Sequence, residues 1–391
     1  MNPSANGWLN LLLNKTEQYS LLWNLPLHEF YFELRKSGFI YGSNIAALGS
    51  DIKTSELTEE EICKINLWFS FYYIYTNFNQ NKSSFTESVI AFYKSNKAYK
   101  TSFLNELINA KENLSLLEKI IDRRIHIDSN VITKSFNYFT INGLLFVDIL
   151  AYEQFLKSNT EISTYTKRVE SIIEMTVFMV FNLKPKKTEY DLSLMKLFEA
   201  SLRYRDDIKL SYEEAIELLK NDLERFYLID MVCMTAWSDQ RIDATEHTFL
   251  TKLTIDLALS KSIVAESVIE INQFYNNYKD KVAFLHSKNL VHSFYNNSTK
   301  LVVKLIRRNS KRLQKELKQS KDVLWILSQS TQRKLTDEEQ KRLQVQLLDI
   351  FKTIPSLAIF ILPGGMLLLP LVIKLIPKLL PSAFDDNRIE E

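Results

Sequence analysis

The chain has 391 residues, 46% of them hydrophobic, and its 49 Lys and Arg against 47 Asp and Glu give a formal net charge of +2. That is enough chain for two or three domains with a substantial core, so one compact unit is not expected. Only seven glycines and eight prolines occur, and because helix interiors tolerate few of these residues, we predict an all-α protein. Cys63 and Cys233 are too few and too far apart for a disulfide framework or a zinc site, which favours a reducing compartment.

The sequence lacks the motifs of catalysis. Its five histidines have no HExxH spacing, no glycine-rich loop offers a phosphate cradle, and no serine stands in a nucleophile-elbow context. We therefore predict a non-enzymatic protein with no cofactor and no small-molecule substrate. The first residues also lack the charges and cleavage motif of a secretory signal, so the bulk of the chain is expected in the cytoplasm.

Residues 1–204 are predicted to form an N-terminal domain of amphipathic and buried helices. Thr58 and Glu61 have the spacing of a capping box ahead of an apolar run. We interpret the aromatic cluster at 68–75 as core packing rather than as a ligand cage. The apolar stretch at 175–181 is predicted to be part of a core helix, because it is too short to span a membrane.

Residues 205–285 are predicted to form a middle helical domain. A second capping box, Ser211 with Glu214, begins it ahead of a long helix. Residues 230–246 combine an apolar helix with an acidic turn and the start of a further helix, and they are similar to the TerB-like helical domain of tellurite resistance. Gln240 stands where that family carries a glycine.

The acidic turn is a candidate cation site. Its carboxylates are Asp239, Asp243 and Glu246, and hard cations take carboxylate oxygens as ligands. The TerB-like resemblance also implies metal binding. In the alternative interpretation Asp243 caps the next helix and Glu246 closes its capping box.

Residues 286–352 are predicted to be a basic helical linker. Between 300 and 352 there are fourteen Lys or Arg against six Asp or Glu, and the basic residues recur every three or four positions, as on one side of a helix. Beside an apolar segment this pattern is typical of contact with anionic lipid headgroups. Contact with RNA or a ribosome and a solvated helix face are the other interpretations. The residues assigned to the contact are Lys304, Arg307, Arg308, Lys311, Arg312 and Lys315.

An apolar run with regularly spaced prolines dominates residues 353–391. Residues 353–373 carry no charge, and about twenty apolar residues is the length that a helix needs to cross a bilayer. We predict a membrane segment that is kinked at its prolines and bends most at its Pro-Gly-Gly. The alternative is a proline-broken hairpin buried under the N-terminal helices. The residues assigned to the segment are Pro355, Pro363, Gly364, Gly365, Pro370, Lys374, Pro377 and Pro381.

This run resembles the membrane segment of the Letm family, which is known mainly from mitochondrial inner membranes. Residues 363–384 match the family's proline spacing without a gap, including Lys374-Leu375 and the closing Pro-Ser-x-Phe, and a looser likeness extends over 296–391. The resemblance implies membrane association and cation homeostasis, and the family continues into a helical ribosome-binding-like domain. Met366 stands where the family commonly carries a glutamate, so we expect little or no cation exchange by this segment alone.

Together these observations predict a non-enzymatic, Letm-like bacterial protein at the inner membrane that acts in cation homeostasis or in an envelope or biofilm-related function. The excess of Lys and Arg before residue 353 places the N-terminal bulk in the cytoplasm. Membrane lipids are the expected partners, and a ribosome, RNA, another membrane protein or a second copy of the chain are further options. The alternative function is a cytosolic helical scaffold or a ribosome-associated binding protein.

Overall fold

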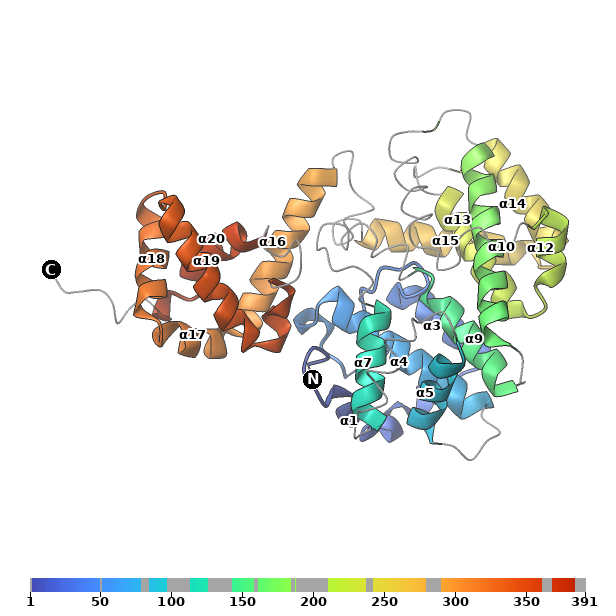
Figure 1. The fold of residues 1–391 in the computed structure, drawn as a ribbon. Coiled ribbons are helices and arrows are strands. Elements are labelled where there is room, and N and C mark those ends of the chain that lie inside the picture. Colours follow the sequence, from blue (N-terminus) through green and yellow to red (C-terminus); the bar gives the residue numbers. More distant parts are fainter. Residues whose placement is uncertain are drawn as a thin grey trace. The chain divides into compact units, whose positions relative to one another are not determined.

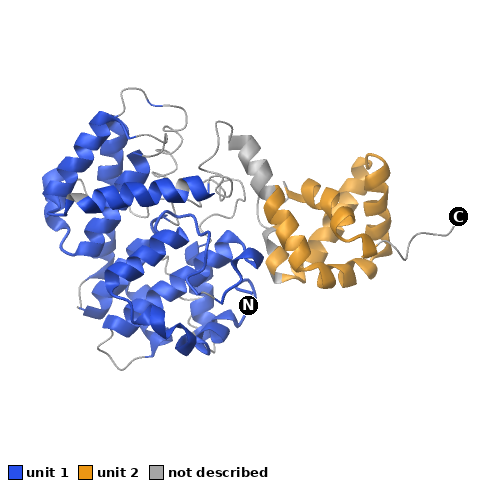
Figure 2. Ribbon diagram, turned by 180° about the vertical axis from the view of Figure 1, so that it is seen from behind, with its two compact units in different colours: residues 1–127, 136–288 blue, residues 128–135, 289–391 orange. Residues whose placement is uncertain are grey.

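The structure is a computed structural model, and its described elements are all helices (Figure 1), which confirms the predicted all-α class. The described part of the chain forms two compact units (Figure 2): unit 1 is residues 1–127 with 136–288, and unit 2 is 128–135 with 289–391. The residues that the structure describes are 2–49, 51–78, 84–96, 113–125, 143–157, 161–183, 187, 210–236, 242–278, 290–360 and 368–383.

Unit 1 is a multi-helical body organised around two central helices, α4 and α13. α4 packs against α7 and α9, and α13 packs against α10 and α15. α4 carries apolar residues on all of its sides, as is typical of a helix enclosed by others, and residues 61–71 within it are all buried. The described elements are α1 (Trp8–Leu13), η1 (Thr16–Tyr19), α2 (Ser20–Trp23), α3 (Leu27–Ser37), η2 (Thr54–Glu56), α4 (Glu59–Phe78), α5 (Phe85–Ser95), α7 (Asn113–Ile125), α9 (Leu145–Lys157), α10 (Ile162–Leu183), α12 (Tyr212–Leu218), α13 (Asp222–Ala236), α14 (Ala244–Asp256) and α15 (Lys261–Tyr278).

Aromatic side chains fill the core of unit 1 around α4. Trp68 and Phe69 are fully buried, and Phe30 of α3 stacks on Tyr73 with ring centroids 3.7 Å apart. The prediction that the cluster at 68–75 is core packing is therefore confirmed. Aromatic pairs of this kind add roughly 0.5–1.5 kcal/mol beyond the area they bury.

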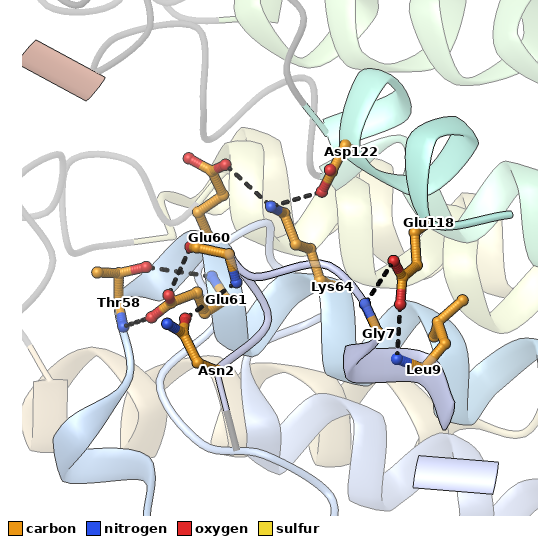
Figure 3. Close-up of polar contacts among 10 residues, drawn as sticks. Asn2, Gly7, Leu9, Thr58, Glu60, Glu61, Lys64, Glu118 and Asp122 are labelled. Atoms are coloured by element: carbon orange, nitrogen blue, oxygen red, sulfur yellow. Dashed lines mark hydrogen bonds and ion pairs between the residues drawn. The ribbon is translucent and has the colours of Figure 1, made fainter. Parts of the chain in front are cut away.

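Carboxylates of α4 and α7 hold the N-terminal segment of unit 1 (Figure 3). Glu118 accepts hydrogen bonds from the backbone N–H groups of Gly7 and Leu9, at 2.9 and 3.0 Å. The first N–H groups of a helix have no partner inside the helix, so Glu118 satisfies the start of α1. The hydroxyl of Ser4 donates to Glu61 at 2.6 Å. The chain start is thus connected to two helices that follow it in sequence.

Both capping boxes predicted at the starts of α4 and α12 are present. The N–H of Thr58 donates to the Glu61 carboxylate at 2.9 Å, and the N–H of Glu61 donates to the Thr58 hydroxyl at 3.2 Å. Ser211 and Glu214 exchange the same pair of hydrogen bonds at the start of α12. Each box satisfies two N–H groups that the helix leaves unpaired, and so fixes where the helix begins.

Unit 2 is a smaller helical body whose core is mostly aliphatic. α20 packs against α16 and α18, while α19 packs against α18 and η5. Leucine, isoleucine and valine side chains from each described α-helix of this unit, α16 to α20, are buried together in this core. The described elements are α16 (Leu290–Arg308), α17 (Ser310–Lys318), α18 (Lys321–Gln332), α19 (Asp337–Lys352), η5 (Pro355–Phe360), α20 (Leu369–Leu379) and η7 (Pro381–Ala383).

The domain boundaries predicted after residues 204 and 352 stay predictions, but the hydrophobic cores of the two units extend across both positions. α12 to α15 share one hydrophobic core with the helices that precede residue 204. The stretch predicted as a basic linker supplies α16 to α19, which bury their apolar faces together with α20 in the core of unit 2. Its charge alone suggested a linker, but its leucines and isoleucines make it a structural part of this unit.

The apolar run after residue 352, predicted to be a kinked membrane segment, is described at residues 353–360 and 368–373. Its described part folds into η5 and α20, and α20 has 11 residues, about half of the length that crosses a bilayer. Leu357, Phe360, Leu369 and Val372 are fully buried in the core of unit 2. The predicted buried alternative is closer, but the covering helices are α16 to α19 instead of the N-terminal ones. No helix in the described ranges has the length and the apolar composition to cross a membrane.

Three described prolines of this run, Pro355, Pro370 and Pro381, lie at the starts of short helices, whereas Pro377 lies inside α20. Pro370 lies in the first turn of α20, where a helix needs no N–H. Pro370 and Lys374 are exposed and Pro377 is half-buried, so the prolines and lysines share the outer side of α20. Pro355 begins η5 and Pro381 begins η7. The predicted bend and the departure from the Letm pattern lie outside the described residues, at Pro363, Gly364, Gly365 and Met366.

Candidate functional site

Basic side chains cover the outer face of α17. Leu313 and Leu317 are fully buried, whereas Lys311, Lys315 and Lys318 are exposed. Two residues turn an α-helix by about 200°, so Lys311 and Lys315 both project away from the side on which Leu313 is buried. α17 is therefore apolar toward the core and cationic toward solvent.

Exposed basic residues continue from α17 into both neighbouring helices. Arg307 near the end of α16 and Lys321 at the start of α18 are exposed. Asn309 joins α16 to α17, because its N–H donates to the Leu305 carbonyl at 3.1 Å and its carbonyl accepts from the Leu313 N–H at 2.8 Å. We use the name basic row for Arg307, Lys311, Lys315, Lys318 and Lys321.

The structure separates the six basic residues that the sequence assigned to contact. Lys304 and Arg308 are half-buried. Arg312 is exposed, but its guanidinium donates to the carbonyl of Thr353, the residue that ends α19, and so satisfies one of the open carbonyls at that helix end. The three that remain on the exposed surface are Arg307, Lys311 and Lys315.

Two lysines of α20 add exposed positive charge to unit 2. Lys374 and Lys378 are both exposed. The side-chain amide of Gln314 donates to the hydroxyl of Ser382 at 2.8 Å, so η7, which follows α20, lies beside α17. The sequence assigned Lys374 to a membrane segment and did not single out Lys378 or Lys321. The four-residue spacing of the α20 lysines is the helical signal that could have placed both on one outer face.

Unit 2 is strongly basic in its described residues. They contain 16 Lys or Arg and 6 Asp or Glu, a difference of ten positive charges. Ion pairs at the surface of this unit include Arg333–Glu339, Arg342–Asp322 and Lys352–Asp349. Such a charge excess creates a positive potential that attracts anionic surfaces and polyanions.

The predicted cation site before α14 is only partly described. Asp243 caps α14, since its carboxylate accepts from the N–H groups of Thr245 and Glu246 at 2.7 and 2.8 Å. Glu246 accepts from the N–H of Asp243 at 2.9 Å, which completes the capping box of the alternative interpretation. Asp239 lies outside the described residues, so the cation site and the TerB-like resemblance stay predictions. Where side chains are described, no three of His, Cys, Asp or Glu gather as metal ligands.

A group of titratable side chains is buried between three helices of unit 1. Arg35 of α3 donates to Asp230 of α13 at 2.7 Å, and the Tyr31 hydroxyl donates to the same carboxylate oxygen at 2.5 Å. Arg35 also donates to Ser267 of α15 at 3.0 Å. Burial raises the pKa of Tyr31, and the charge of Asp230 raises it further. Because these side chains are buried, we interpret the group as a tie between helices and not as a catalytic site.

Comparison with known families identifies one region of the chain. Residues 335–391 match a family model described as LETM1-like, RBD. The C-terminal region is Letm-like. The match begins just before α19 and includes η5 and α20, so it covers the apolar run and the α20 lysines, whereas the basic row precedes it. The chain matches no curated protein and no solved structure.

Proposed function

We propose that unit 2 docks this protein on an anionic membrane surface, as a non-enzymatic Letm-like factor in cation homeostasis or envelope function at the inner membrane. One observation carries the proposal: the exposed basic row belongs to a unit that buries the described part of its apolar run in its own core. Docking then uses charge on a folded surface and needs no spanning helix. The Letm-like match at residues 335–391 supports the association with membranes.

The expected strength of docking follows from the number of charges that reach the surface. A Lys or Arg close to an anionic bilayer contributes about 1 kcal/mol, so the five residues of the basic row contribute on the order of 5 kcal/mol before any ordering cost. The attraction decays over a Debye length of about 8 Å at physiological ionic strength. Binding should therefore be moderate, reversible and weakened by salt.

Sedimentation with lipid vesicles tests this proposal. The full chain should sediment with vesicles that contain phosphatidylglycerol, should stay in the supernatant with pure phosphatidylcholine, and should be released by 0.5 M salt, which shortens the Debye length to roughly 4 Å. Reversing two charges of the basic row, Lys311→Glu with Lys315→Glu, should abolish most of the binding. Equal binding to both kinds of vesicle would contradict docking by charge.

A control variant on unit 1 distinguishes the effect of the basic row on vesicle binding from the effect of the net charge of the protein. Lys36 and Lys53 have side chains that are 57% and 79% exposed. Lys36→Glu with Lys53→Glu changes the net charge of the protein by the same amount as the test variant. It should leave vesicle binding nearly unchanged. If both double variants lose binding equally, the effect belongs to overall charge and the basic row has no special role.

RNA is the second candidate partner, favoured by the charge excess of unit 2 and by the RBD term in the description of the matched family. Neutralising phosphates releases counterions, so the logarithm of the RNA affinity should fall linearly with the logarithm of salt concentration. A structured ribosomal RNA fragment added to the vesicle assay decides between the two partners. Binding to that fragment at physiological salt, with no binding to anionic vesicles, would replace the membrane proposal by a ribosome-associated function.

A further inference from the structure

Unit 2 exposes two large apolar side chains on neighbouring helices. Trp325 of α18 is 53% exposed and Val345 of α19 is 61% exposed, and they are the large apolar residues that stand out from the described part of this unit. Both helices otherwise follow the usual pattern, with leucine, isoleucine and valine facing the core. Trp325 and Val345 are exceptions to this pattern.

Both side chains point away from the core. Two residues turn an α-helix by about 200°, and each exposed residue has a buried core residue two positions before it and another two positions after it. These flanking residues are Val323 and Leu327 for Trp325, and Leu343 and Leu347 for Val345. Trp325 and Val345 thus lie on the outer sides of α18 and α19.

A polar bridge places the two residues on the same stretch of the α18–α19 hairpin. The Asp322 carboxylate lies 2.8 Å from Nε of Arg342 and accepts a hydrogen bond from the amide of Gln346 at 2.9 Å. Trp325 follows Asp322 by three residues, and Val345 lies between Arg342 and Gln346 in the sequence. Each apolar side chain is therefore within one helical turn of the bridge that joins the two helices.

A lysine precedes each apolar residue by four positions. Lys321 and Lys341 are both exposed, and residues four apart share one face of a helix. The outer face of the hairpin therefore repeats one pattern twice, a lysine followed by an apolar residue. This is the composition of surfaces that lie in a membrane interface, where apolar side chains enter the acyl boundary, lysines reach back to the headgroups, and tryptophan is favoured.

We propose that the outer face of the α18–α19 hairpin, formed by Lys321, Trp325, Lys341 and Val345, enters the interface of an anionic bilayer. The inference rests on the proposed docking function and adds which face of unit 2 meets the lipid. The positive charge excess of the described residues of this unit favours an anionic partner. Among anionic partners, a nucleic acid would stack a base on Trp325 but gains little from an exposed valine, whereas a bilayer takes up both.

A label at position 345 reports insertion directly. The two native cysteines are fully buried, so Val345→Cys in the full chain can be labelled with an environment-sensitive thiol dye. Ile255 of α14 is 63% exposed, and Ile255→Cys gives a matched label on unit 1. Vesicles containing phosphatidylglycerol should shift the emission of the Val345→Cys label to the blue and leave the Ile255→Cys label unchanged.

Substitution of the tryptophan measures its share of the affinity. Trp325→Ser should weaken binding to phosphatidylglycerol vesicles by roughly tenfold, because burial of the apolar ring is lost, and Trp325→Phe should recover much of that loss. Ile255→Ser on unit 1 should leave the affinity unchanged. Circular dichroism should show unaltered folding for each variant, since both positions are exposed.

The outcomes separate this inference from the function on which it rests. A blue shift at position 345 together with the loss in Trp325→Ser supports the inserted face. Vesicle binding that persists while the label stays in water and Trp325→Ser binds normally would leave charge-driven docking in place and overturn the inserted face. Absence of binding to any anionic vesicle would overturn both.

Discussion

Unit 1 places charged side chains inside its core, whereas the ion pairs described in unit 2 lie at its surface. Asp230 and Asp148 of unit 1 are fully buried, and they pair with the buried arginines Arg35 and Arg124. In the described pairs of unit 2 the basic side chain is 42% to 65% exposed and the acidic one 18% to 63%. The two units therefore differ in what their charges can do.

Buried pairs specify which helices meet. Removing a charge from water costs several kcal/mol, and only a well-placed partner offsets that cost. Arg35 with Asp230 connects α3 to α13, and Arg124 with Asp148 connects α7 to α9, so a different packing of these helices would leave charges unpaired. In unit 2 the core is mostly aliphatic, and Lys311 and Lys315 of α17 are exposed to solvent.

The largest expected effect comes from breaking the buried pair in unit 1. Asp230→Ala should cost about 3–5 kcal/mol of unfolding free energy, because it leaves the Arg35 guanidinium buried without its carboxylate. Removing both members, with Arg35→Met and Asp230→Leu together, should cost less than the single change. Urea denaturation followed by tryptophan fluorescence measures both values.

The control for this prediction is a surface pair of the same unit. Lys36 and Glu33 are 57% and 41% exposed, so Glu33→Ala should change the unfolding free energy by about 1 kcal/mol or less. If Asp230→Ala cost no more than Glu33→Ala, the buried pair would not be what holds α3 against α13.

The second effect tests whether the apolar run is core. Ile376 of α20 is fully buried, and Ile376→Ala should cost about 2–5 kcal/mol because it leaves a cavity. Lys374→Ala on the exposed side of the same helix should stay within about 0.5 kcal/mol. Hydrogen exchange of the α18 to α20 amides gives the free energy of unit 2 specifically. Equal protection in the two variants would mean that Ile376 does not pack in this core.

Structural features that depend on neighbouring residues could be predicted from the sequence, whereas contacts between residues far apart in the sequence could not. The capping boxes at Thr58 and Ser211 depend on residues three positions apart, so their pattern was sufficient. Arg35 and Asp230 are 195 positions apart in the sequence, and nothing local reveals that they meet. The all-α class could be predicted from the scarcity of glycine and proline, because these residues interrupt a helix locally, whatever the rest of the fold.

The environment of the apolar run was hard to predict because lipid and a protein core select the same side chains. Residues 353–373 carry no charge, which suits either environment. What decided the outcome was a set of leucines and isoleucines on α16 to α19, whose assembly depends on tertiary packing. The basic surface was predicted only in part, for a similar reason. The spacing of the lysines on α17 is a local pattern and could be recognised. The contact of Arg312 with Thr353 joins residues 41 positions apart and could not.

A smaller effect is expected at the start of α19, where a surface contact fixes a helix end. The N–H of Thr336 donates to Glu339 at 2.8 Å, and the N–H of Glu339 donates to the Thr336 hydroxyl at 3.3 Å. Thr336→Ala should cost about 1 kcal/mol of stability in unit 2, whereas Thr336→Ser keeps the oxygen and should cost little. Thermal unfolding of both variants, followed by circular dichroism, measures these stability changes. If the two variants lost the same stability, the capping hydroxyl would not be the group that stabilises the start of α19.

The smallest effect is a pH dependence that a surface pair adds to unit 2. The Arg333 guanidinium donates two hydrogen bonds to Glu339, at 2.8 and 2.6 Å, and with the Thr336 N–H it lowers the pKa of Glu339 from 4.5 to about 2. Because the folded pKa is the lower one, the stabilisation is complete above pH 4.5 and is lost as the pH falls toward 2. Its size is small, since the pair is exposed to solvent. A carboxyl titration by NMR should find the Glu339 midpoint near the lower value, and Arg333→Gln should move the midpoint back toward 4.5. A wild-type midpoint of 4 or above would show that the pair is not held in solution.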